Sequence, residues 1–168
     1  MGSYHLMKLK NYLKKFIKTL MKHSKYYYEK NRNMPVKNEL KYFKKDLSEF
    51  DSPDLKGSGL KNMSMNFVER LDQARHLTNG VPFRITSGFR TPEYHANLKK
   101  RGYHTSPTSL HLEGLAADIA TPDARSRYKI ITSLLAIGFT RLGIGQGFVH
   151  VDQAPETKKS QEVMWDYY

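Results

Sequence analysis

The chain has no cysteine among its 168 residues. Disulfide bonds and cysteine-ligated zinc sites are therefore excluded, and cysteine usage leaves the redox compartment open. No apolar run approaches the roughly 18–20 residues that a membrane-spanning helix needs. Lysines interrupt each apolar stretch near the N-terminus and no cleavage site follows, so we expect neither a signal peptide nor a transmembrane helix.

Negative charge is scarce in the first part of the chain. The net charge is +12, and residues 1–45 hold 13 Lys/Arg against 2 Asp/Glu, whereas residues 46–168 hold 15 against 14. Apolar residues recur there at helical spacing, with lysines filling much of the remainder. They are Leu6, Leu9, Leu13, Phe16, Ile17, Leu20 and Met21.

We therefore expect residues 1–45 to form a basic amphipathic helical arm, separate from a domain at 46–168. Such a helix either lies on an anionic membrane or polymer, or packs on the domain with a solvated lysine face. The charge pattern favours an anchoring element over a nucleic-acid-binding domain. The oligomeric state is left open.

The pattern of residues 46–168 predicts an α+β domain with a small antiparallel sheet and helices packed behind it. Helices are expected over 65–77, from Pro92 to a stop at Gly102, and from about residue 121 to near Gly138. Strands are expected over 83–87, 115–120, 139–144 and 148–151, the last two joined by a glycine-containing hairpin.

The stretch Ser109-Leu-His-Leu-Glu-Gly-Leu-Ala-Ala-Asp118 carries the strongest chemical signal. A neutral imidazole at His111 and a carboxylate at Asp118 are both good zinc ligands. The best candidate for a third ligand is His150 in Gly147-Phe-Val-His-Val-Asp152. Taken one at a time, His111 is better explained as a surface loop histidine and Asp118 as a hydrogen-bond acceptor; the joint pattern favours the metal site.

The ten-residue motif, followed by a strand with His-x-Asp, resembles the zinc D-Ala-D-Ala carboxypeptidases and L-alanyl-D-glutamate peptidases of the peptidase M15 type. The segment Thr86-Ser-Gly-Phe-Arg-Thr-Pro-Glu-Tyr94 is similar to the Ser-Gly-Tyr-Arg segment of that family. The resemblance implies the zinc-site fold shared with the hedgehog domain, one zinc ion, and cleavage of peptidoglycan stem peptides. It also implies that Arg90 grips a substrate oxygen and that Ser109 donates a hydrogen bond to substrate.

Asp152 has three possible roles. The relatives carry Glu-x-x-His or His-x-His here, whereas Gly147 stands three residues before His150, so the usual glutamate is absent. Asp152 is therefore our candidate proton acceptor. Alternatively it ligates the metal and His150 is the base, or it only orients a zinc-binding histidine.

Two functions follow from these residues. The first is a zinc metallopeptidase that cuts stem peptides at a bond involving a D-amino acid, as a carboxypeptidase or as a lysin-type endopeptidase of bacterial or phage origin. A lysin would be made in the cytoplasm and act at the cell wall. The second is a zinc-containing module that binds wall peptides without turnover, which the missing glutamate favours.

Overall fold

The computed structural model describes residues 40–103 and 105–167. The expected basic arm falls largely on residues 1–39, so this prediction lies outside the described residues. Within residues 40–45, Phe43 is buried in the core, and the backbone N–H groups of Lys41, Tyr42 and Phe43 donate to the carboxylate of Asp72. The domain boundary at residue 45 stays a prediction.

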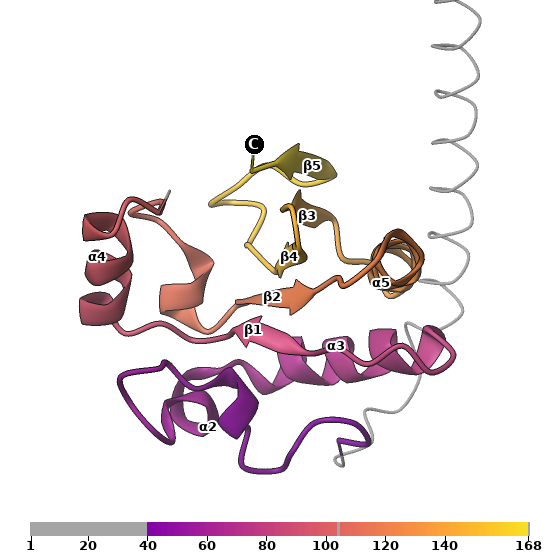
Figure 1. Ribbon diagram of the computed structural model, residues 1–168, viewed down its shortest axis with the longest axis horizontal. Helices are drawn as coiled ribbons and strands as arrows, with labels where there is room; N and C mark the ends of the chain where they lie inside the picture. The colour runs from indigo at the N-terminus through magenta and orange to yellow at the C-terminus, as the bar shows by residue number, and fades with distance from the viewer. Residues whose placement is uncertain (1–39, 104, 168) are drawn as a thin grey trace, which may run out of the picture.

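The described chain begins with helical segments, mixes helices and strands in its middle, and ends with three strands (Figure 1). The elements are η1 (Ser48–Phe50), α2 (Ser58–Asn62), α3 (Met65–Leu77), β1 (Ile85–Ser87), α4 (Pro92–Lys100), η2 (Leu110–Glu113), β2 (Ala116–Ala120), α5 (Ala124–Ala136), β3 (Arg141–Ile144), β4 (Phe148–Asp152) and β5 (Val163–Asp166), where η marks a 3₁₀ turn.

Each of the three longer helices begins at a side chain that accepts a backbone N–H. Ser64 caps α3, Thr91 caps α4 ahead of Pro92, and Asp123 caps α5. These caps satisfy donors that the first helical turn leaves unpaired. The expected helix over 65–77 is confirmed residue for residue, and the expected start of α5 is two to three residues early.

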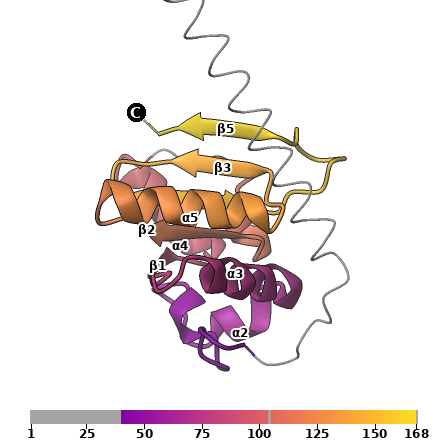
Figure 2. The same ribbon diagram turned by 90° about the vertical axis from the view of Figure 1, so that its right-hand side faces the viewer.

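The strands form one sheet in the order β1-β2-β4-β3-β5. The first three pairings are antiparallel, and β5 adds to β3 in parallel. The predicted α+β class is confirmed, and the parallel edge strand makes the sheet mixed rather than purely antiparallel. In Figure 2, α5 lies in front of the sheet and α4 behind it.

The two faces of the sheet differ in chemistry. Side chains alternate between the faces along each strand. One set of residues is apolar and joins the hydrophobic core with α3 and α5: Ala117, Ile119, Leu142, Val149 and Val151. The alternate set on β2, β3 and β4 carries buried polar groups: Asp118, Arg141, His150 and Asp152.

The core face thus fixes the strands in register, and the opposite face of the same strands holds the polar cluster. A shift of one residue would exchange these two sets. Among the described residues, none of the helices has both the length and the apolar character needed to cross a bilayer.

Candidate metal centre

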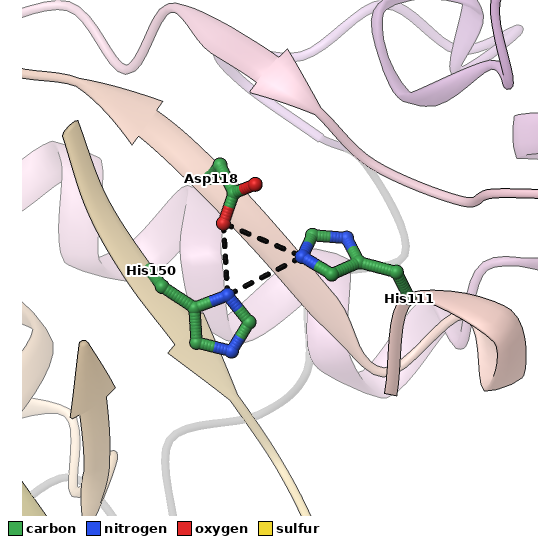
Figure 3. Close-up of side chains that lie close together, drawn as sticks. All are labelled: His111, Asp118 and His150. Atoms are coloured by element: carbon green, nitrogen blue, oxygen red, sulfur yellow. Dashed lines mark hydrogen bonds and ion pairs between the residues drawn. The ribbon is translucent and has the colours of Figure 1, made fainter. Parts of the chain in front are cut away.

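Three elements bring the predicted ligands together (Figure 3). Asp118 and His150 are paired directly across β2 and β4, so both side chains point to the same face. His111 comes from η2, the turn that precedes β2. Gly114 ends this turn with φ of 66°, and a Cβ there would lie 1.9 Å from the carbonyl oxygen of Asn62. Only glycine fits this position, which explains the glycine of the motif.

The three ligand atoms form a small triangle. His111 Nε2 lies 3.3 Å from His150 Nδ1 and 3.3 Å from Asp118 Oδ1, and His150 Nδ1 lies 2.8 Å from Asp118 Oδ1. Ligands held tetrahedrally at 2.0–2.1 Å from zinc are about 3.3 Å apart. All three residues are buried. The spacing and the donor set therefore fit a zinc ion with one position left open for water or substrate.

The outer hydrogen bonds of the two histidines determine which atoms face the triangle. His111 Nδ1 donates to the carbonyl oxygen of Gly88 at 2.7 Å, which leaves a lone pair on Nε2 in the neutral ring. His150 Nε2 lies 3.3 Å from Asp152 Oδ2, and donation there leaves a lone pair on Nδ1. Two ring lone pairs and a carboxylate oxygen of Asp118 then converge, which is the arrangement that a metal cation between them would require.

Burial and the contacts within the cluster shift the pKa values of all three residues, and those of Asp118 and His111 shift in the direction that suits metal ligands. Burial tends to raise the pKa of Asp118, but His111 and His150 hold that pKa well below its usual value. Burial lowers the pKa of His111. Burial also acts to lower the pKa of His150, and its hydrogen bonds with Asp118 and Asp152 outweigh this and raise it. The carboxylate is therefore ionised, as a metal ligand must be.

Arg90 lies beside the triangle. Its Nη2 donates to Asp118 Oδ2 at 2.7 Å and its Nε donates to Ser87 Oγ at 2.8 Å. The guanidinium thus holds the outer oxygen of the carboxylate whose other oxygen faces the triangle. Within residues 40–103 and 105–167, the hydrogen bonds of the Arg90 side chain are made by Nε and Nη2 and not by Nη1.

Asp152 sits on the far side of His150 from the triangle. Its Oδ1 accepts from Arg141 Nε at 2.7 Å and from the backbone N–H of Ala154 at 3.2 Å. Its Oδ2 contacts His150 Nε2, the ring nitrogen that points away from the other two ligands. Burial tends to raise the pKa of Asp152, but hydrogen bonds from His150 and Arg141 lower it.

Ser109 lies at the N-terminal end of η2, and its side chain makes no cap hydrogen bond there. Its backbone N–H donates to Ser106 and its carbonyl accepts from Leu112. The backbone role of a turn residue is therefore observed, and the hydroxyl group's contact with substrate stays a prediction.

Sequence reasoning missed three side chains beside the site. Arg141 was available as a signal, because it is the one charged residue in the apolar run of 139–144. Trp165 and Tyr167 come from β5 and the residue after it, and their rings lie 5.6 Å and 6.1 Å from that of His150. No local pattern marks residues 163–166 as a neighbour of His150.

Residues 17–152 match the model of a protein family described as peptidase M15, which is well over half of the chain. The chain belongs to the peptidase M15 family. The resemblance found from the motifs is thereby confirmed, and the protein is a peptidase of a metal-dependent family that acts on peptidoglycan-type substrates. A search of curated proteins found no match.

The bounds of the family match are informative at both ends. It begins at residue 17, inside the segment that we expect to be an arm. It ends at Asp152, the last residue of β4, so β5 and its aromatic side chains lie beyond it.

Proposed function

We propose that the protein hydrolyses peptidoglycan stem peptides at a bond involving a D-amino acid, with one zinc ion held by His111, Asp118 and His150. The observation that carries this proposal is the triangle of ligand atoms, 2.8–3.3 Å on each side, whose outer hydrogen bonds direct lone pairs inward. A zinc ion there supplies Lewis acidity and activates water for attack at neutral pH.

The surrounding residues orient the ligands and bind the substrate. Arg90 fixes Asp118 through one oxygen, and its Nη1 offers a donor to a substrate carboxylate or carbonyl oxygen. Ser109 offers a hydroxyl group at the entrance of the motif turn. Because the substrate would be bound in one orientation by these groups, the scissile bond can be held against the metal.

For Asp152, the contacts support the orienting role over the proton-accepting role. A carboxylate on the outer nitrogen of a metal-binding histidine fixes the tautomer and increases the basicity of the inner nitrogen. Asp152 is in this position and is also bound by Arg141. The acid–base role of Asp152 stays a prediction, which its asparagine variant tests.

The rival proposal is a zinc-containing module that binds wall peptides without turnover. The observation that favours it is the same pair of contacts, because an aspartate engaged by Arg141 and His150 is poorly placed to accept a proton from water. Loss of turbidity of purified cell walls, with chelator, without it, and with zinc added back, separates the two. Binding of the walls without loss of turbidity or release of fragments would support the module.

The cell-wall digestion also identifies which bond of the stem peptide is cleaved. Mass spectrometry of released fragments distinguishes a carboxypeptidase, which removes a terminal D-alanine, from a lysin-type endopeptidase, which cuts within the stem. We further propose that residues 1–45 concentrate the enzyme on an anionic wall polymer or membrane.

A further inference from the structure

The strand registers place five residues in one row across the sheet. Ser87 pairs with Asp118, Asp118 with His150, His150 with Gly143, and Gly143 with Trp165. Residues that pair directly across neighbouring strands point to the same face. Two metal ligands therefore lie in the middle of the row, with Ser87 at one end and Trp165 at the other.

Gly143 leaves a gap in this row. A Cβ at this position would lie 2.5 Å from Tyr167 Cε2 and 2.8 Å from Trp165 Nε1, closer than a Cβ normally approaches any other heavy atom. The two aromatic side chains occupy the space that any other residue would fill. Through this gap their rings reach His150, at centroid distances of 5.6 Å for Trp165 and 6.1 Å for Tyr167.

The two ends of the row differ in chemistry. At the β1 end, Arg90 bonds to Ser87 and Asp118 and offers a cationic donor. At the β5 end the surface is aromatic, and Tyr167 keeps 43 % of its area exposed while its ring also packs on Phe148 at 5.4 Å. A ligand that crosses the metal centre thus meets a cation on one side and an aromatic surface on the other.

The distances limit which part of a substrate the aromatic surface can touch. A residue in an extended peptide spans about 3.3–3.6 Å. Trp165 and Tyr167 lie within 6.1 Å of the ring of His150, so they reach only the residues that adjoin the scissile bond.

We propose that Trp165 and Tyr167 form the binding surface for the apolar side chain on the acyl side of the scissile bond, which is an alanine methyl group in a stem peptide. This assignment rests on the proposed function, and it adds that Arg90 takes a carboxylate on the amine side while the scissile carbonyl lies at the metal. The acyl side then falls at the β5 end, where contact with the aromatic rings removes a methyl group from water.

The test compares matched peptides that differ by one methyl group. The pairs are a stem peptide ending in D-Ala-D-Ala with its Gly-D-Ala counterpart, and a peptide containing L-Ala-D-Glu with its Gly-D-Glu counterpart. For the bond that the full-length, zinc-loaded protein cleaves, we expect kcat/KM to be about fourfold higher with alanine, as burial of one methyl group implies.

Variants assign this preference to the aromatic residues. Tyr167→Ala should bring the alanine-to-glycine ratio close to one, and Tyr167→Phe should restore it because the ring is kept. Met164→Ala is the matched control, since Met164 is 54 % exposed and alternates to the opposite face of β5. A merely structural role of Tyr167 would lower kcat/KM equally for both peptides and leave the ratio unchanged.

The fluorescence of Trp165 gives a readout that needs no variant and no turnover. Trp165 is the only tryptophan of the chain, so tryptophan emission reports on the β5 end of the site alone. We expect a saturable shift of the emission when the alanine peptide binds, with a weaker response to the glycine peptide.

The outcomes separate this inference from the proposed function. Cleavage with no alanine preference, or with no change of Trp165 emission, would overturn the aromatic binding surface and leave the peptidase intact. If neither peptide is cleaved and neither changes the emission, the proposed function fails first and the inference fails with it.

Discussion

Replacement of Asp152 by asparagine decides between its two main roles. Asparagine has the same shape, but its amide group would present a donor where the carboxylate accepts. Facing His150 Nε2, which now lies 3.3 Å from Asp152 Oδ2, that donor favours the tautomer with the proton on Nδ1. The lone pair of His150 that faces Asp118 and His111 would then be lost.

The orienting role therefore predicts weaker metal binding. Loss of a carboxylate behind a metal-binding histidine typically weakens affinity 10- to 100-fold, or about 1.4–2.8 kcal/mol. The fold should also lose stability, because the buried guanidinium of Arg141 loses its ion pair at 2.7 Å. We expect about 3 kcal/mol, the low end for breaking a buried pair, because Arg141 also donates to Ser160 O and lies 5.3 Å from the ring of Trp165.

The assay is a competition titration of zinc against a chromophoric chelator, followed by turnover measured at saturating zinc. The orienting role predicts that excess zinc restores most of the activity. The proton-accepting role predicts unchanged zinc affinity and a loss of turnover of about 10²- to 10⁴-fold that zinc does not restore. Asp166→Asn is the control, an exposed aspartate on β5. Unchanged zinc affinity in Asp152→Asn would refute the orienting role.

Three further predictions follow from the site, the arm and the caps. His111→Ala should abolish tight zinc binding while His76→Ala leaves it intact, and a His111 variant with stoichiometric zinc would contradict the ligand assignment. Deletion of residues 1–35 should leave hydrolysis of a small soluble peptide unchanged but weaken binding to anionic vesicles in a sedimentation assay, by about 1 kcal/mol per lysine and by less at high salt. Equal sedimentation of the full-length and shortened proteins would contradict the surface role. A shortened protein that misfolds would support a helix packed on the domain. Hydrogen bonds from Ser126 lower the pKa of Asp123 in the folded protein. The helix cap at Asp123 therefore stabilises the fold fully above the pKa that Asp123 has in the unfolded chain, about 3.8, and this stabilisation is lost as the pH falls below that value. Thermal unfolding should therefore separate Asp123→Ala from the wild type at neutral pH and less so in acid.

Local signals explain what the sequence predicted well. A serine cap at one end and Asn79-Gly80 at the other predict the helix over 65–77. Asn79 and Gly80 both adopt positive φ in the structure. The ligands of the metal centre were found because His111 and Asp118 share one short motif. His150 was chosen as the best later candidate for a third ligand, and the family resemblance supports that choice, since no local rule links residues 32 positions apart.

Long-range pairing explains what the sequence did not reveal. β5 is only four residues long and none of its residues is fully buried, so its alternation is too weak to identify a strand. Its parallel pairing with β3 depends on the loop from residue 153 to 162, which carries no signal of direction. The same holds for the ion pair of Arg141 and Asp152, which forms only because β3 and β4 are in this register.

Gly143 is a local sequence feature whose role becomes clear only from the long-range pairing of the strands. In the sequence Arg-Leu-Gly-Ile this glycine looks like an interruption of a strand, because glycine weakens strands and has no side chain that could pack against neighbouring residues. In the sheet it stands between His150 and Trp165, and its missing side chain is what lets the aromatic residues of β5 reach the metal centre. A Gly143→Ala variant would have to displace the rings of Trp165 and Tyr167, because the added Cβ would lie within 3 Å of both. The proposed zinc ligands would remain in place on η2, β2 and β4, so this variant should separate binding of zinc from recognition of the substrate.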